Sequence, residues 1–260
     1  MSLQSALITL NSLESRRSAL RIDSRFQITV TVVYLVAMLS VPLADPGRLV
    51  WMAVYPIVMA EASGTGYGRV ALKSLWILPL VVLVGAFNPL LDHSPAWRIG
   101  PVTVSMGWVT FLSICLRGLL AMQAVLVLIY STGFYAICVA LGRMGLPPVL
   151  TTQLLMVYRY ISVLLQEAIS MDRARAARGY GRRNYPLRLW ATMVGQLLMR
   201  SVERSQRIHR AMLARGFNGS MPASTIMRSR SADWCYLLLW TAVCAVLRFV
   251  DFSAILGKLL

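Results

Sequence analysis

Long apolar runs with at most one charged residue divide much of the chain into candidate membrane-spanning segments. A helix needs about 20 mostly apolar residues to cross a bilayer, because lipid offers the backbone no hydrogen-bond partners. The runs that meet or approach this length cover residues 26–44, 49–60, 74–91, 105–130 and 234–250. The second run has only twelve residues, so by itself it is also consistent with a re-entrant or interfacial segment.

Between the fourth and fifth runs, the pattern changes to the 3.6-residue period of amphipathic helices. The first such helix is predicted to open at residues 146–148, since proline is tolerated in the first turn of a helix. Its polar residues recur at steps of three and four and its opposite face is apolar. The second helix is predicted to start near Pro186, with an apolar stripe that begins at Trp190 and a favourable i,i+4 pair of Glu203 and Arg207.

Both amphipathic helices end in the same motif. Residues 173–180 (RARAARGY) and 210–217 (RAMLARGF), 37 residues apart, share the pattern R-A-x-x-A-R-G-aromatic. The glycine suits the left-handed residue just past a helix end, and arginine in the last turn complements the helix dipole. A generic helix terminator needs neither the shared alanine nor the shared aromatic residue. A small alanine beside a long arginine makes a projection that can enter a groove of a partner protein, and two projections suggest two equivalent grooves.

The composition indicates a membrane protein with a basic face. Charged residues make up 14% of the chain and apolar residues 57%, whereas a soluble domain typically carries about 25% charged residues. The net charge is +16, and residues 143–230 contain fifteen arginines, no lysine and three acidic residues. Basic loops resist translocation, so this region and the arginine-bearing N-terminus are predicted to be cytoplasmic. An even number of spans must separate them, which favours a complete crossing by residues 49–60.

The predicted fold class is therefore an all-α integral membrane protein with about five transmembrane helices and two long amphipathic cytoplasmic helices. Residues 1–130 are expected to form the N-terminal transmembrane helices and residues 233–260 the C-terminal one. Residues 131–232 are expected to form the cytoplasmic region with its two Ala-Arg-Gly tips. The expected location is the cell (inner) membrane, in multiple passes, with the N-terminus and residues 131–232 on the cytoplasmic side.

No residues are arranged in the sequence for catalysis or for holding a cofactor or a metal ion. A phosphate-binding loop is absent, since the pair at 257–258 (Gly-Lys) lacks the preceding glycine and the following Ser or Thr. The two histidines, His93 and His209, fall on opposite sides of the membrane in the predicted topology and lack neighbouring ligands of suitable spacing. The chain itself is therefore predicted to be non-catalytic, with no catalytic, cofactor-binding or metal site.

Arg117 interrupts the fourth apolar run and leaves three possibilities. An arginine inside a span is costly and by default suggests an ion or substrate path. It can equally face the bundle and donate to backbone carbonyls of another helix, or lie near a span end from which it reaches the interface. Glu61 is a possible partner for it.

The two Ala-Arg-Gly motifs resemble those of the transmembrane (T) component of energy-coupling factor (ECF) ABC transporters. The wider sequence resembles the cobalt-uptake branch, the CbiQ family. The segments that carry this resemblance are residues 158–161, 166–168, 200–205 and 211–217. Near the N-terminus, residues 22–25 (IDSR) resemble that family's Asp-Pro-Arg element, with serine in place of proline.

This resemblance implies an energy-coupling scaffold without activity of its own. Its two amphipathic helices would be coupling helices resting on a dimer of cytoplasmic ABC ATPases, which hydrolyse ATP. A separate integral membrane subunit would capture the substrate, most simply cobalt ion. The docking residues implied for the two tips are Ala177, Arg178, Gly179, Ala214, Arg215 and Gly216.

Other functions stay open on the sequence. T components for nickel or for a vitamin carry the same tips, so the cobalt substrate depends on the flanking sequence alone. A membrane enzyme acting on anionic lipids through the basic insert would need an acid, a base or a nucleophile there. The available side chains are Glu167, Asp172, Glu203 and His209. Nucleic-acid binding would explain the charge, but the periodic apolar faces disfavour it and no nucleic-acid partner is expected.

Overall fold

The computed structural model describes residues 22–43, 46–91, 95–99, 102–178, 187–219 and 230–249. They form two compact units, which we describe separately. The bundle unit comprises the described residues of 22–133 and 230–249, and the arm unit those of 134–219. The bundle unit contains α2 (Ser24–Leu39), α3 (Pro46–Met52), α4 (Val54–Ala62), α5 (Tyr67–Ser74), the 3-10 helix η1 (Leu75–Ile77), α6 (Leu78–Gly85), α7 (Asn88–Leu91), β1 (Pro95–Ile99), β2 (Val102–Ser105), α8 (Met106–Thr132) and α12 (Ser231–Phe249).

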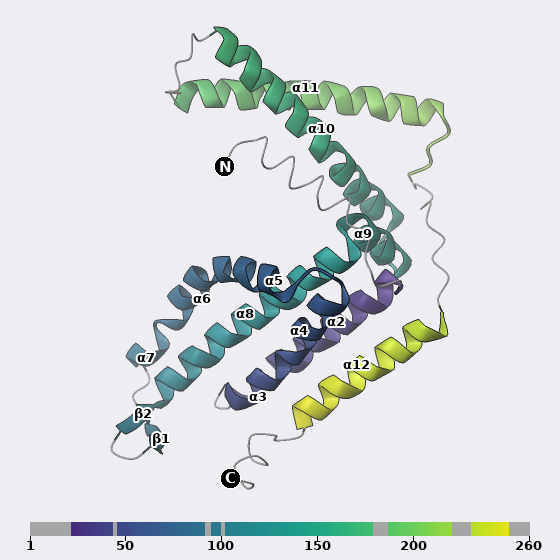
Figure 1. Ribbon diagram of the computed structural model, residues 1–260. Coiled ribbons are helices and arrows are strands. Elements are labelled where there is room, and N and C mark those ends of the chain that lie inside the picture. Colours follow the sequence, from purple (N-terminus) through teal and green to yellow (C-terminus); the bar gives the residue numbers. More distant parts are fainter. Residues whose placement is uncertain are drawn as a thin grey trace. The chain divides into compact units, whose positions relative to one another are not determined.

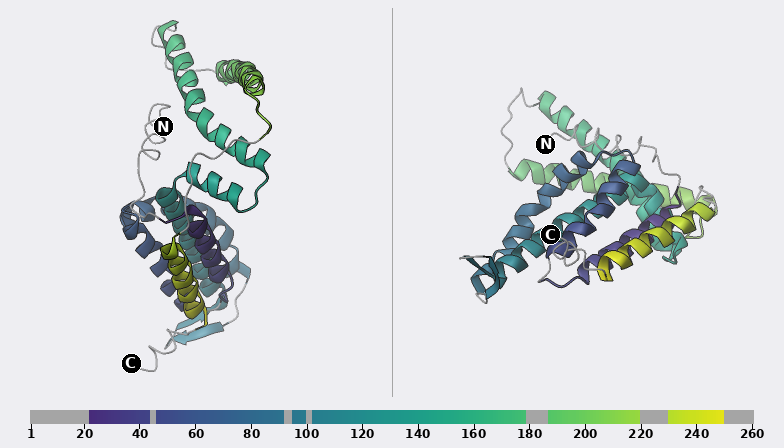
Figure 2. Two further views of the ribbon diagram at one scale, coloured as in Figure 1. Left: turned by 90° about the vertical axis from the view of Figure 1, so that its right-hand side faces the viewer. Right: turned by 60° about the horizontal axis from the view of Figure 1, so that its bottom comes forward.

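The long helix α8 is the centre of the bundle unit. It contacts α2, α3 and α4 on one side and α5, α6 and α7 on the other (Figure 1). Helix α12 packs along α2, and the two run side by side in both views of Figure 2. The first and last predicted spans are therefore neighbours, although more than 180 residues of chain separate them.

The core of the bundle unit is built around stacked aromatic side chains. Tyr34 of α2 stacks on Tyr55 of α4 with ring centroids 4.4 Å apart, and Trp240 of α12 meets Tyr55 edge-on at 4.8 Å. The two tyrosine hydroxyls are satisfied, because Tyr34 donates to the Met52 carbonyl at 3.1 Å and Tyr55 bonds the Thr31 hydroxyl at 3.0 Å. Polar tips paired in this way let large aromatic rings fill a helix interface without leaving an unmet hydrogen bond.

Asp233 joins the first turns of α2 and α12. It is 2% exposed and accepts from the backbone N–H of Asp23 at 3.2 Å and from that of Arg230 at 2.8 Å. The side chain of Asp23 caps α2 by accepting from the Arg25 N–H at 3.2 Å. One carboxylate thus satisfies the free amides at the starts of two helices that are far apart in sequence.

Helices α6 and α8 approach closely because each presents a glycine to the other. A Cβ on Gly118 of α8 would come within 2.6 Å of Val81, and one on Gly85 of α6 within 2.9 Å of Phe111. The expected span at 74–91 begins earlier than predicted and is interrupted. Its helical stretch runs from Tyr67 to Gly85 through α5, η1 and α6.

Arg117 donates a hydrogen bond from Nη2 to the backbone carbonyl of Val41, just beyond the end of α2. Of the three possibilities left by the sequence, the bundle-facing arginine is the arrangement found. Glu61 is not its partner, since the Glu61 carboxylate accepts from the Tyr67 N–H at 2.9 Å. Ser113, one turn before Arg117, donates to the carbonyl of Leu43 at 2.7 Å. Side chains of α8 therefore supply donors to backbone carbonyls of the segment that follows α2.

The all-α membrane fold class is confirmed, with one departure among the described residues. Strands β1 and β2 form a short antiparallel hairpin that the sequence analysis did not predict. Val102, Thr103 and Val104 are β-branched residues, which favour a strand over a helix. The apolar run from which the fourth span was predicted begins as this strand and becomes helical at Met106.

Three described helical stretches are long and apolar enough to cross a membrane: Tyr67–Gly85, Met106–Thr132 and Pro148–Arg178. The first two match predicted spans, whereas the third was predicted to be a cytoplasmic amphipathic helix. The short predicted span at 49–60 is divided between α3 and α4, so its complete crossing stays a prediction. The count of five spans and the cytoplasmic placement of 131–232 also stay predictions.

The arm unit consists of α9 (Phe134–Arg143), α10 (Pro148–Arg178) and α11 (Leu187–Ala214). Helix α9 packs on the beginning of α10, where Phe134 stacks on Tyr158 with centroids 5.2 Å apart. Gly142 allows this approach, because a Cβ there would lie 2.8 Å from Thr151. Helix α10 begins at the predicted Pro148 and α11 directly after Pro186, so the starts of both predicted helices are confirmed.

Candidate docking site on the arm unit

The second Ala-Arg-Gly tip ends α11 with a full set of cap hydrogen bonds. The Phe217 N–H donates to the Met212 carbonyl and the Gly216 N–H to the Leu213 carbonyl, both at 3.0 Å. This is the Schellman pattern, and Gly216 takes the left-handed conformation it requires, with φ of +80°. The side chains of Phe217 and Met212 line the same groove, as the motif's apolar contact predicts. The cap explains the glycine and the aromatic residue, and it leaves Ala214 and Arg215 exposed at the end of the helix.

The first tip ends α10 in a comparable position. Helix α10 includes Ala177 and finishes at Arg178, and both residues are exposed. Gly179, the third predicted docking residue of this tip, lies outside the described residues. Within the described part of the chain, Arg178 and Arg215 therefore occupy matching places, at or next to the last helical residue of a long helix.

Neither tip arginine is bonded within the described part of the chain. No ion pair or hydrogen bond involves the guanidinium of Arg178 or that of Arg215. A free guanidinium presents five donors in a planar fork, which suits a carboxylate or a cluster of carbonyls on another protein. The two tips are thus positioned to bind and are not engaged in holding the arm together.

The structure places the two tips at opposite ends of the helix pair and does not bring them together. Helices α10 and α11 cross (Figure 1), and the loop after α11 returns to the start of α10, where Thr152 donates to the Gly219 carbonyl at 3.5 Å. The end of α10 approaches the start of α11, since Met171 and Trp190 line one cavity. From Thr152 to Arg178 the helix rises about 40 Å at 1.5 Å per residue, which sets the scale of the separation between the tips.

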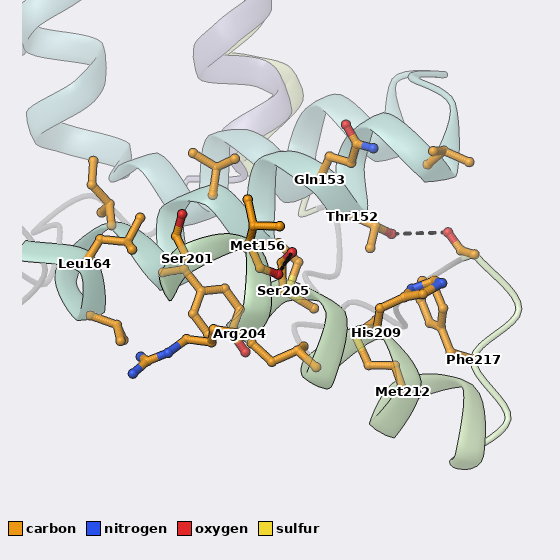
Figure 3. Close-up of a pocket in the computed structure, with 18 residues that line it drawn as sticks. Thr152, Gln153, Met156, Leu164, Ser201, Arg204, Ser205, His209, Met212 and Phe217 are labelled. Carbon is orange, nitrogen blue, oxygen red and sulfur yellow. Dashed lines mark hydrogen bonds between the residues drawn. The ribbon is translucent and has the colours of Figure 1, made fainter. Parts of the chain in front are cut away.

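Two apolar grooves lie between α10 and α11, one on each side of their crossing. The long groove, of about 710 Å³, lies between residues 149–164 and residues 201–219. Figure 3 shows its two walls, with Met156 and Leu164 on α10 facing Ser205 and Met212 on α11. The short groove, of about 360 Å³, lies between residues 161–171 and residues 190–197. Val157 in the long groove and Val194 in the short groove are 64% and 59% exposed, so the arm unit presents apolar surface that its own helices do not cover.

An ion pair across the crossing is the feature that the sequence analysis missed. Arg200 of α11 donates from Nη1 to Oε1 of Glu167 on α10 at 2.5 Å. The sequence analysis predicted instead a pair within α11, between Glu203 and Arg207, and no ion pair between these two residues is found. Glu167 is one of three acidic residues among fifteen arginines in 143–230, and this scarcity was the available signal that it has a specific partner.

Only one of the two histidines, His209, lies in the described part of the chain. His209 lies on α11 and lines the long groove beside Met212 and Phe217, whereas His93 lies outside the described residues. Within the described ranges, no three His, Cys, Asp or Glu residues are grouped so that they could hold a metal ion. The residues that point to a function in the arm unit are therefore the tips and the grooves.

Comparison with known proteins relates most of this chain to one family. The profile of the family described as cobalt transport protein, CbiQ, matches residues 15–225. The cobalt transport protein CbiQ of Rhodobacter capsulatus is 34% identical over 82 residues, which are 31% of this chain and 34% of that protein. That of Salmonella typhimurium is 32% identical over 114 residues, which are 42% of this chain and 51% of that protein. The chain thus aligns with about a third to a half of the length of these curated relatives.

Proposed function

Because the chain belongs to the CbiQ family of cobalt transport proteins, we propose that it is the energy-coupling membrane subunit of an ECF-type ABC importer. In this role the chain binds a dimer of cytoplasmic ATPases and a separate membrane subunit that captures the substrate. The chain performs no catalysis itself, and ATP hydrolysis takes place on the ATPases. The arm unit and the N-terminus lie on the cytoplasmic side of the cell membrane.

The observation that carries this proposal is the pair of matching arginine tips. Arg178 and Arg215 end two long helices with the same local sequence, both are exposed, and within the described residues neither has an intramolecular partner. Identical tips at the two ends of a crossed helix pair fit two identical grooves about 40 Å apart along the arm. A dimer of ATPases has two such equivalent surfaces. Arginine at each tip would form bidentate bonds with acidic or carbonyl groups there.

The long helices supply the mechanical link between the ATPases and the rest of the importer. An α-helix is stiff along its axis because each turn is hydrogen-bonded to the next. Closing of the ATPases on ATP would move the two tips, and α10 and α11 would transmit the displacement along their length. The apolar grooves would receive the substrate-capturing subunit, since exposed apolar surface of this extent marks an interaction site.

Cobalt ion is the proposed cargo. Both curated relatives are named cobalt transport proteins, and this chain offers the cargo no ligand cluster among its described residues. The cargo would therefore be selected by the substrate-capturing subunit. Uptake of cobalt by the assembled importer, with nickel and a vitamin as competing cargoes, tests this part of the proposal.

The docking role is tested by co-purification of the ATPases with variants of the tips. The change of Arg178 and Arg215 to Glu should abolish ATPase binding, because two favourable charge pairs become like-charge contacts. The protein should still reach the membrane, since neither side chain holds the arm together.

The matched control changes Arg159 and Arg207 to Glu, which alters the net charge equally on the same two helices. Both arginines are exposed and neither lies at a tip. This variant should retain the ATPases. Full ATPase binding by the tip variant, or equal loss in the tip and control variants, would contradict the assignment of the tips.

A further inference from the structure

The two grooves between α10 and α11 meet at one place along the helix pair. Leu164 of α10 lines both grooves and also a small polar cavity of about 150 Å³ between them. On α11, Leu197 borders the short groove and Ser201 the long groove, and both border the polar cavity. The crossing point is therefore confined to about one turn of each helix around Leu164 and Leu197–Ser201.

The ion pair of Glu167 and Arg200 lies at this crossing. Both residues line the small polar cavity, and their side chains are 28% and 58% exposed, respectively. Arg204 and Arg207 line the same cavity from α11, so Glu167 faces a wall that is otherwise mainly cationic. A partly exposed ion pair adds little to stability. The Glu167–Arg200 ion pair is therefore of interest for its position. It joins α10 to α11 at their crossing, where it can restrict the angle between the two helices.

Elsewhere the two helices are held together weakly. The grooves on both sides leave the apolar side chains apart. Polar contacts away from the crossing include those of Arg175 Nη1 with the Met193 sulfur and of Thr152 with the Gly219 carbonyl, each at 3.5 Å. The crossing angle therefore depends on the ion pair together with contacts nearer the helix ends.

We propose that Glu167 and Arg200 are positioning residues that set the crossing angle of α10 and α11, and through it the distance between the two arginine tips. This inference builds on the proposed function, in which the tip separation is what the ATPases act on. Arg178 lies 11 residues beyond Glu167, about 16 Å along α10, and Ala214 lies 14 residues beyond Arg200, about 21 Å along α11. With arms of this length, a rotation of about 10° at the crossing displaces each tip by about 3 Å.

The first test measures the tip separation in the isolated full-length chain. Spin labels are placed at the exposed and equivalent positions Ala174 and Ala211, in a background without the four native cysteines. Each single reversal, Glu167→Arg or Arg200→Glu, should shift the mean distance by about 2 Å or broaden its distribution, because like charges then meet at the crossing and the labels lie about 10 and 16 Å from it. The double variant restores an opposite-charge pair and should recover the original distance distribution.

The matched control reverses the charge of Arg188, which is exposed on α11 and borders neither groove nor the polar cavity. Arg188→Glu should leave the distance unchanged. Single reversals at Glu167 and Arg200 without effect, or a double variant that fails to recover the distance distribution, would overturn the inference. This measurement needs no ATPases, so its result is independent of whether the proposed docking function holds.

The second test measures coupling in the reconstituted importer. Single reversals at Glu167 or Arg200 should lower the cargo transported per ATP hydrolysed several-fold while the ATPases stay bound, and the double variant should regain it. A purely structural role would lower ATPase binding and transport together. Unchanged coupling in both single variants would overturn the inference, whereas loss of ATPase binding by the tip variants alone bears only on the proposed function.

Discussion

Replacement of Asp233 should show how much the bundle unit depends on the junction between its first and last helices. The carboxylate is 2% exposed and accepts two backbone N–H groups, those of Asp23 and Arg230, one with each oxygen. Alanine removes the N-terminal cap of α12 and leaves the Asp23 amide buried without an acceptor. A lost cap costs about 0.5–2 kcal/mol and an unmet buried donor about 1–3 kcal/mol. The sum is a loss of about 1.5–5 kcal/mol, or about 3–20 °C in the midpoint of thermal unfolding.

Asparagine at this position discriminates between this explanation and a simple packing effect. Asn has nearly the same shape as Asp but only one acceptor oxygen, so its NH₂ group would face one of the two backbone N–H groups. Asp233→Asn should therefore destabilise the purified protein about as much as Asp233→Ala, measured by thermal unfolding in detergent. The control is Asp172→Asn on α10, which should change the midpoint little. A midpoint for Asp233→Asn equal to that of the unsubstituted protein would refute the reasoning.

Three further predictions concern the helix packing and the tips. Gly118→Val should destabilise the bundle unit by about 1–3 kcal/mol, because its Cβ would come within 2.6 Å of Val81. The midpoint of thermal unfolding should fall, and adding Val81→Ala should restore part of the loss. Gly216→Ala should destabilise the end of α11 by about 1–2 kcal/mol, because φ of this residue is +80° while no atom obstructs the new Cβ. Hydrogen exchange at the Phe217 amide should become faster in this variant. Gly216→Asn should destabilise the helix end less. Binding of the ATPases should weaken as salt rises from 0.05 to about 0.5 M, since exposed arginines are screened over a Debye length of about 10 Å or less, and salt-independent binding would contradict charge-based docking at the tips.

The sequence was sufficient to locate the two long helices of the arm unit, α10 and α11, whereas the short helix α9 was not predicted. Pro148 opens α10, and the glycine of the second repeat ends α11 in the predicted left-handed conformation. These features depend on interactions between residues at most a few positions apart, such as caps and the fixed backbone angle of proline. The docking role of the two tips was also predicted from the sequence, because the repeat shares more residues than a helix end requires, and it stays a prediction.

The pairs that hold the protein together were beyond the reach of sequence reasoning. The predicted pair of Glu203 and Arg207 follows the spacing rule within one helix, whereas the observed pair joins Glu167 to Arg200 on another helix. The Asp233 junction joins residues 210 positions apart, and the acceptor for Arg117 lies 76 positions away in the chain. Each depends on which helices become neighbours, and composition and periodicity do not determine this.

Local physics therefore determined where α10 and α11 begin and end, and that both carry matching arginine tips. Only the tertiary structure decided that these tips lie at opposite ends of a crossed pair and that the first and last helices of the bundle are neighbours. It also decided that the third predicted span is an interrupted helix held to α8 by two glycines. Helix signals act within one or two turns of chain, whereas packing depends on shape complementarity between segments that meet only after the chain has folded.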